Sequence, residues 1–133
     1  MDGKEKILYV DDETINLELF KINFRNEYDV VVANSAIKGL EILKGEPIKV
    51  VVSDLKMPVM NGLDAARRMR ALADEPGGER FATLPIIAMT ALAMKHDVEH
   101  SLAAGMNDHV TKPIDPDLLL AVLGKWLLPR ADA

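Results

Sequence analysis

The chain has 133 residues, contains no cysteine and carries a formal net charge of −5 at pH 7. This length suits one domain with a full hydrophobic core, and the absence of cysteine excludes disulfide bonds and thiolate metal sites. The acidic balance argues against direct nucleic-acid binding, which requires a basic face. No apolar leader precedes the first apolar run, and no run approaches the roughly 18 residues of a membrane span, so we expect a cytoplasmic protein.

The first half of the chain alternates between two periods. Short apolar runs bounded by polar residues predict buried parallel strands at residues 6–10, 28–32 and 48–53. A helix is predicted over about residues 13–26, from the helical spacing of Ile15, Leu19 and Ile22 with Phe20 and Phe24. Asn34-Ser35 is typical of a helix N-cap, and the residues with helical spacing after it are Ile37, Leu40 and Leu43.

The second half continues the alternation. A third helix is expected after the loop at residues 55–62, with one face formed by Ala66, Met69 and Leu72 or Ala73. Residues 74–84 contain Pro76-Gly77-Gly78 and predict a mobile surface loop. The remaining predicted elements are a strand at 85–89, a helix at 93–104 closed by Gly105, a short strand that contains His109-Val110, and a last helix. Asp115-Pro116 caps this helix, with Pro116 at its first position, and residues 118–128 fill it.

Five βα units, with no internal repeat, predict a single domain over residues 1–133 built as a doubly wound, five-stranded parallel α/β sheet. The common strand order at this size is the flavodoxin-like 2-1-3-4-5, whose switch point lies between the first and third strands. Asp11 and Asp12 follow the first of these strands, and Asp54 follows the third. Three carboxylates converging there would repel one another unless a cation neutralised them, and such oxygen ligands suit Mg²⁺.

Two further residues complete this group. Thr90 ends the fourth predicted strand and Lys112 ends the fifth, so both are expected at the same crevice. They supply a hydroxyl donor and an ammonium opposite the acids, as an anionic phosphoryl group requires. An aspartate can act as a nucleophile and form an acyl phosphate, so this combination favours phosphoryl transfer.

Four motifs, in this order, resemble the receiver domain of two-component response regulators, over about residues 5–128. They are Val10-Asp11-Asp12-Glu13, the stretch from Asp54 to Gly62, Met89-Thr90-Ala91, and Lys112-Pro113. Residues 90–94 and 104–108 are similar to receivers that belong to hybrid histidine kinases or work beside them. Both a stand-alone regulator and a part of such a kinase agree with this resemblance.

The resemblance implies a metal site and an acceptor. Asp54 would accept a phosphoryl group from a phosphohistidine. Asp12 would ligate Mg²⁺ directly, and Asp11 would hold the metal mainly through water. The backbone carbonyl of Lys56 would be the third protein ligand.

The resemblance also implies a phosphoryl-binding group and a switch. Lys112, the Thr90 hydroxyl and the Ala91 backbone N–H would bind the phosphoryl oxygens, and Pro113 would follow a cis peptide bond. Thr90 would be drawn toward the phosphoryl group, and the surface of the last two predicted helices and the strand between them would repack. His109 stands where the family commonly carries the aromatic residue of this switch.

The implied partners are a histidine kinase or a histidine phosphotransfer protein, with an effector or a second copy of the chain on the switched surface. No binding to nucleic acid or to a membrane is expected. The resemblance implies a signalling module that catalyses its own phosphorylation and dephosphorylation, not an enzyme in the ordinary sense. The alternatives are a Mg²⁺-dependent phosphatase with an aspartyl nucleophile, in which Lys56 stands where a general acid is needed, and a pseudo-receiver that is not phosphorylated.

Overall fold

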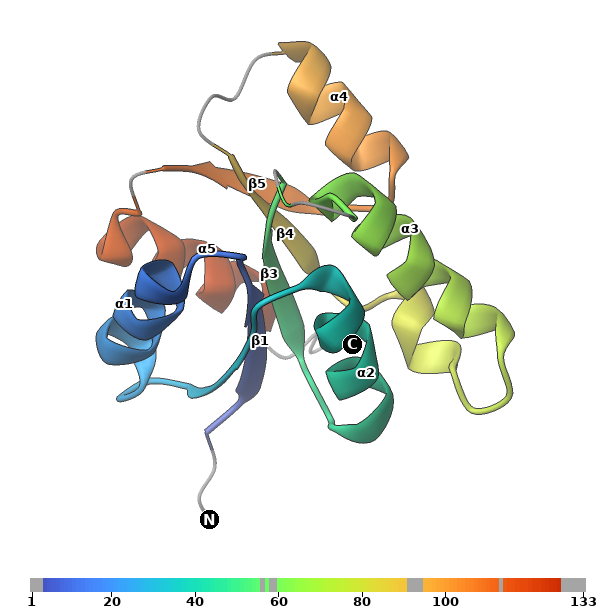
Figure 1. Ribbon diagram of the computed structural model, residues 1–133, viewed down its shortest axis with the longest axis horizontal. Coiled ribbons are helices and arrows are strands. Elements are labelled where there is room, and N and C mark those ends of the chain that lie inside the picture. Colours follow the sequence, from blue (N-terminus) through green and yellow to red (C-terminus); the bar gives the residue numbers. More distant parts are fainter. Residues whose placement is uncertain (1–3, 56, 58–59, 91–94, 113, 128–133) are drawn as a thin grey trace.

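A computed structural model describes residues 4–55, 57, 60–90, 95–112 and 114–127. Its strands are β1 (Lys6–Val10), β2 (Asp29–Ala33), β3 (Val50–Asp54), β4 (Ile86–Thr90) and β5 (Asp108–Thr111). All neighbouring pairs are parallel, in the order β2-β1-β3-β4-β5 (Figure 1). The predicted fold class and strand order are therefore confirmed.

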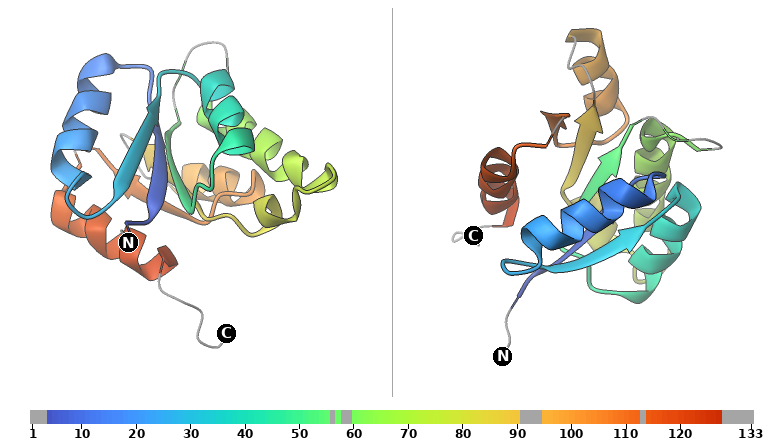
Figure 2. Two further views of the ribbon diagram at one scale, coloured as in Figure 1. Left: turned by 90° about the horizontal axis from the view of Figure 1, so that it is seen from below. Right: turned by 60° about the vertical axis from the view of Figure 1, so that its left-hand side comes forward.

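Helices cover both faces of this sheet. Helices α1 (Thr14–Phe24) and α5 (Pro116–Leu127) lie on one face, and α2 (Ala36–Gly45) and α3 (Gly62–Ala71) lie on the other (Figures 1 and 2). Helix α4 (Lys95–Ala103) projects from the end of the molecule where β4 and β5 lie. Within the described residues, no helix combines the length and the apolar character that a membrane crossing requires.

The strand residues are sorted between two hydrophobic clusters by the alternation of side chains along each strand. In β1, Leu8 and Val10 point toward α2 and α3, whereas Ile7 and Tyr9 point toward α1 and α5. The central strands are buried on both faces, which is why they are continuous apolar runs in the sequence.

Side-chain caps fix where several helices begin. The Ser35 hydroxyl accepts a hydrogen bond from the Lys38 backbone N–H at 3.1 Å, as predicted. The Asp115 carboxylate accepts from the Asp117 N–H at 3.0 Å, with Pro116 as the first residue of α5. Gly105 follows α4 with a φ of 103°, a backbone conformation that favours glycine.

Helix α1 was predicted correctly, but its orientation differs from the one that its spacing suggests. Ile15, Leu19 and Ile22 are 72%, 52% and 55% exposed. The face packed against the sheet consists instead of Leu17, Phe20 and Phe24. The helix has two apolar stripes on opposite sides, and the one that contains both phenylalanines buries the larger side chains.

Most of residues 74–84 are exposed, as the predicted surface loop requires, but part of this connection is helical. Two short 3₁₀ helices, η1 (Leu72–Asp74) and η2 (Glu79–Ala82), occupy this connection. Phe81 and Leu84 are buried in the cluster beneath α2 and α3. Arg80 also donates a hydrogen bond of 2.6 Å to the backbone carbonyl of Leu43 at the end of α2. The apolar residues of the segment thus anchor it despite its glycines. The predicted start of the fourth helix, at residues 93–94, lies outside the described residues.

Candidate functional site

The three predicted acids meet at the edge of the sheet where the strands end. Asp11 and Asp12 come directly after β1, Asp54 is the last residue of β3, and these two strands are neighbours. One carboxylate oxygen from each acid lies within 4.8 Å of the others. Asp11 is 0% exposed and Asp54 6% exposed, whereas Asp12 faces solvent. The cluster therefore has a buried side and an open side.

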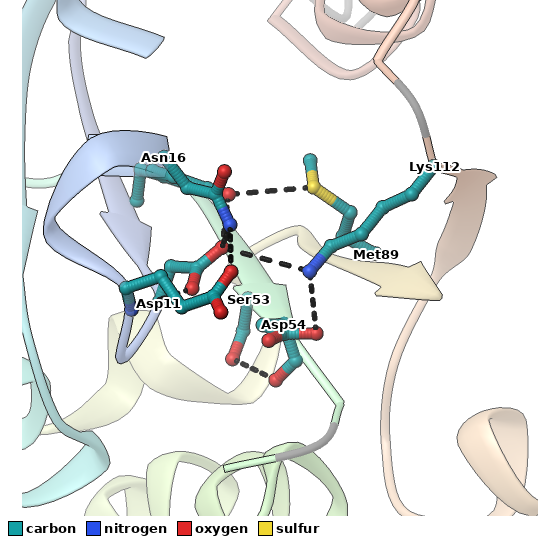
Figure 3. A network of polar contacts seen from close by, with 8 residues as sticks. Asp11, Asn16, Ser53, Asp54, Met89 and Lys112 are labelled. Atoms are coloured by element: carbon teal, nitrogen blue, oxygen red, sulfur yellow. Dashed lines mark hydrogen bonds and ion pairs between the residues drawn. The ribbon is translucent and has the colours of Figure 1, made fainter. Parts of the chain in front are cut away.

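Lys112 reaches into this cluster from the end of β5. Its Nζ lies 3.3 Å from Asp54 Oδ1 and 3.7 Å from Asp11 Oδ2 (Figure 3). The lysine side chain is 29% exposed. Its backbone N–H donates a hydrogen bond of 2.8 Å to the carbonyl of Thr90, which ties the ends of β4 and β5 together. The ammonium thus neutralises part of the charge that the two buried carboxylates share.

Asp11 is held by three hydrogen bonds in addition to this ion pair. The Tyr9 hydroxyl donates to Oδ2 at 2.5 Å, the Asn16 amide donates to Oδ2 at 3.1 Å, and the Glu13 backbone N–H donates to Oδ1 at 3.0 Å. The buried carboxylate is therefore well supplied with donors, as a buried charge requires.

Sequence reasoning missed Tyr9 and Asn16. Tyr9 was interpreted only as part of an apolar strand, although residues two apart on a strand share a face and Asp11 is two residues later. Burial, and then the hydrogen bond to Asp11, raise the pKa of Tyr9 above its ordinary value. The phenol is thus a neutral donor at physiological pH.

The loop after β3 fixes the backbone of Asp54. The Asn61 side chain caps α3 by accepting from the Asp64 N–H at 2.9 Å, and the Gly62 N–H donates to the Leu55 carbonyl at 2.9 Å. A Cβ on Gly62 would lie 2.5 Å from the Asp54 carbonyl oxygen. Only glycine permits this close approach, so Asn61-Gly62 positions the end of β3 and the start of α3 together.

The remaining predicted residues are placed in part. Thr90 is half-buried at the end of β4, one residue after Met89, which pairs with Asp54. His109 is half-buried in β5, and its backbone N–H donates to the Asp108 carboxylate at 2.9 Å. Lys56, Ala91 and Pro113, predicted as a carbonyl ligand, a phosphoryl-binding N–H and the residue after a cis peptide bond, lie outside the described residues.

The acid cluster has the chemistry of a Mg²⁺ site. Its donors are carboxylate oxygens, the hard ligands that this ion prefers. The formal charges of the three acids exceed that of Lys112 by two, which one divalent cation balances. Asp12, on the open side, leaves room for the water molecules that Mg²⁺ retains. The residues present therefore fit the ion.

Comparison with known proteins assigns a family to this arrangement. Residues 7–124 match the response regulator receiver domain family. A protein of Leptolyngbya boryana described as an uncharacterized 14.6 kDa protein in the sodA1 3′ region is 39% identical over 92% of this chain and 89% of its own length. The hybrid signal transduction histidine kinase I of Dictyostelium discoideum is 34% identical over 90% of this chain, which spans only 7% of that kinase.

Solved structures are similar over almost the whole chain. The receiver domain of the sensor histidine kinase PA1611 of Pseudomonas aeruginosa, with a magnesium ion coordinated in its active site cleft, has a TM-score of 0.79 and 31% identity, covering 93% of this chain and 98% of that one. A receiver domain from Saccharomyces cerevisiae, that of Ssk1, was crystallised with the histidine phosphotransfer protein Ypd1. The matching chain of this crystal structure has a TM-score of 0.83 and 27% identity, and the alignment covers 95% of the present chain and 90% of the matching one.

Proposed function

This chain belongs to the response regulator receiver domain family, and on that premise we propose that Asp54 accepts a phosphoryl group from a phosphohistidine in a Mg²⁺-dependent reaction. The observation that carries the proposal is the Asp54 carboxylate itself, which ends β3 beside two other acids and 3.3 Å from the Lys112 ammonium. A phosphoryl acceptor needs a nucleophilic oxygen and neighbouring positive charge, and this site combines the two.

In the proposed step, a carboxylate oxygen of Asp54 attacks phosphorus in line with the P–N bond of the phosphohistidine. The new P–O bond forms as the P–N bond breaks, and the electron pair of the P–N bond stays on the ring nitrogen. The donor imidazole, protonated at its other nitrogen, leaves as a neutral ring. Lys112 would pair with one phosphoryl oxygen, and the Thr90 hydroxyl and Ala91 N–H would bind others.

The metal roles in this proposal are those implied by the family resemblance, and the hydrogen bonds and burial of Asp11 and Asp12 support them. Asp12 is exposed and would ligate Mg²⁺ directly, with Asp54 and the Lys56 carbonyl. Asp11 already accepts three hydrogen bonds, so its carboxylate would hold the metal mainly through water. When bound, Mg²⁺ would offset the negative charge of the carboxylates and of the phosphoryl oxygens. The magnesium ion in the related PA1611 receiver supports this part of the proposal.

The phosphodonor would be a histidine phosphotransfer protein or a histidine kinase, docked on the exposed stripe of α1 formed by Ile15, Leu19 and Ile22. A donor must bring its imidazole to Asp54, so it must contact elements that border the cluster. The first turn of α1 is one of these, because Asp11 accepts hydrogen bonds from Glu13 and Asn16. The apolar α1 stripe would receive the apolar face of a partner helix. The receiver crystallised with a histidine phosphotransfer protein supports this class of partner.

Output would pass through α4, β5 and α5. Leu102 on α4 and Leu118 on α5 are 54% and 51% exposed, which leaves apolar side chains for an effector or a second copy of the chain. His109 is half-buried in β5, which connects these two helices in the chain. Movement of Thr90 on phosphorylation would reach this surface through the end of β4.

Intact-mass spectrometry after incubation with acetyl phosphate and Mg²⁺ tests the acceptor. The parent protein should gain one phosphoryl group, whereas Asp54→Asn, and the parent in the presence of a chelator, should gain none. A parent that stays unmodified would identify a pseudo-receiver, and a labelled Asp54→Asn protein would move the acceptor to another residue.

Transfer from a phosphorylated histidine phosphotransfer protein tests the docking surface. Leu19→Glu should slow this transfer by about tenfold or more, because a charge would be buried in the contact. The same variant should accept phosphate from acetyl phosphate at the parent rate. Ile37→Glu on α2 is the matched control, since Ile37 is 51% exposed and Leu19 52% exposed. Equal slowing by both substitutions would exclude α1 as the docking helix.

A further inference from the structure

Tyr9 places a hydroxyl group on the buried side of the acid cluster. The residue is fully buried in β1, and its ring stacks on that of Phe20 in α1 with centroids 4.1 Å apart and an interplanar angle of 9°. Phe20 in turn packs against Phe24 at 4.6 Å. These contacts fix the ring and therefore the position of its hydroxyl, which donates to Asp11 Oδ2 at 2.5 Å and lies 3.5 Å from Met89 Sδ.

Two neutral hydrogen-bond donors and one cation surround the same oxygen of Asp11. Oδ2 accepts the hydrogen bonds from Tyr9 and Asn16, and the Lys112 ammonium lies 3.7 Å from it. The ammonium is closer to Asp54, at 3.3 Å. Without the phenol, a carboxylate at 0% exposure would lose its shortest hydrogen bond and would replace it by moving toward Lys112.

We propose that Tyr9 is a positioning residue of the metal site, whose hydroxyl holds the Asp11 carboxylate where metal-bound water can reach it and keeps Lys112 on Asp54. This inference rests on the proposed function, because it assigns a role toward the ion of that site. Carboxylates near a metal depend on partners of this kind, and loss of one such partner typically weakens metal binding by about 10- to 100-fold.

The Mg²⁺ dissociation constant of Tyr9→Phe tests the proposal. The substitution keeps the ring that stacks on Phe20 and removes only the hydroxyl. Titration calorimetry well below the melting temperature should give a dissociation constant about tenfold weaker than that of the parent, at the lower end of the usual range because Asn16 and the Glu13 N–H remain. Tyr28→Phe, at the other tyrosine of the chain, should bind Mg²⁺ as the parent does.

A purely structural role for the hydroxyl makes a different prediction. It would lower the melting temperature of the metal-free protein and leave the Mg²⁺ dissociation constant of the folded protein unchanged. A Tyr9→Phe protein that binds Mg²⁺ within twofold of the parent would therefore overturn the proposal.

A second arm asks whether the hydroxyl acts through Asp11. In an Asp11→Asn background the buried charge is absent, so adding Tyr9→Phe should change the Mg²⁺ dissociation constant by less than about twofold. A further tenfold weakening there would place the action of the hydroxyl elsewhere and overturn the proposal, even if the single variant does not fold. A parent protein that binds no Mg²⁺ would instead contradict the proposed function itself, which separates the two failures.

Discussion

The ammonium of Lys112 lies 3.3 Å from the carboxylate of Asp54, although the two residues come from strands that are not neighbours in the sheet. Strand β4 lies between β3 and β5, so the two side chains meet across the carboxyl end of β4. Lys112 is thus already in place beside the oxygen that would carry the phosphoryl group, and phosphorylation would exchange one anionic partner of the lysine for another.

Lys112→Met should change both the free energy of unfolding and the rate of phosphorylation, by amounts that can be measured separately. It leaves Asp11 and Asp54 buried without their cation, which should destabilise the metal-free protein by roughly 1–3 kcal/mol, less than for a fully buried pair because Lys112 is 29% exposed. Phosphorylation by acetyl phosphate should slow by about 100-fold, as when one charge-stabilising group is removed from an active site. Urea unfolding and intact-mass time courses measure the two effects.

The exposed Lys49→Met variant is the control for losing one lysine charge. If Lys112→Met and Lys49→Met were phosphorylated at the same rate, Lys112 would have no part in stabilising the transferred group.

Much of the site could be predicted because it depends on strand order. The carboxyl ends of parallel strands meet at one edge, so acids after the first and third strands must converge once the order 2-1-3-4-5 is inferred. Lys112 follows by the same reasoning from the end of β5. Predicting that these residues meet required no knowledge of side-chain packing.

The features that were missed depend on packing. Helix α1 has one apolar stripe at Ile15, Leu19 and Ile22 and another on the opposite side, and periodicity alone cannot decide which one faces the sheet. Residues 74–84 have the composition of a loop and most of them are exposed, yet the buried side chains of Phe81 and Leu84 anchor the segment. In the sequence, Tyr9 is one more residue of an apolar strand, and only its position two residues before Asp11 indicates a role for its hydroxyl.

Mg²⁺ should raise the melting temperature by binding the folded protein alone. At about ten times the dissociation constant, linkage contributes roughly 1.4 kcal/mol, or about 4–6 °C for a chain of this size. Asp12→Ala should lose most of this shift, because Asp12 is the acid that faces solvent. The same substitution should stabilise the metal-free protein slightly, since it removes one of three repelling charges.

Differential scanning fluorimetry with and without Mg²⁺ measures both effects, with K⁺ at matched ionic strength as the control. A parent protein that shows the same melting temperature in millimolar Mg²⁺ and in K⁺ would rule out the metal site.

Asp108 should give the fold a specific acid dependence. Burial alone raises the pKa of this carboxyl group. The carboxylate accepts hydrogen bonds from the Trp126 indole at 3.0 Å and from the His109 N–H at 2.9 Å, and it lies near the charge of Lys125. Together these interactions outweigh the effect of burial and lower the pKa of Asp108 below its ordinary 3.8. A lowered pKa in the folded state means that the ionised form is favoured by folding. The resulting stability is present above pH 3.8 and is lost as the pH falls through the folded-state pKa.

Asp108→Asn should therefore be less stable than the parent by roughly 1 kcal/mol at pH 7, a modest value because the group is partly exposed. The difference should narrow toward zero below pH 3.8. Urea unfolding followed by Trp126 fluorescence at several pH values measures it, with the exposed Asp74→Asn as the control. A difference that stays constant down to acid pH would mean that the charge of Asp108 contributes nothing to stability.

Thr90→Ala should weaken the conformational response of α4, β5 and α5 more than it slows the phosphorylation of Asp54. Thr90 ends β4, and its carbonyl accepts a hydrogen bond from the Lys112 N–H at 2.8 Å. Strand β4 lies between β3, which ends at Asp54, and β5. Its hydroxyl would offer the phosphoryl group one neutral hydrogen bond, worth about 0.5–1.5 kcal/mol net, whereas Lys112 and Mg²⁺ carry most of the charge neutralisation. Asp54 of the variant should therefore still accept phosphate from acetyl phosphate.

Amide exchange of α4, β5 and α5, with and without beryllofluoride as a phosphoryl mimic, should respond less in the variant than in the parent. Identical exchange responses in the two proteins would show that the Thr90 hydroxyl does not couple the site to this surface.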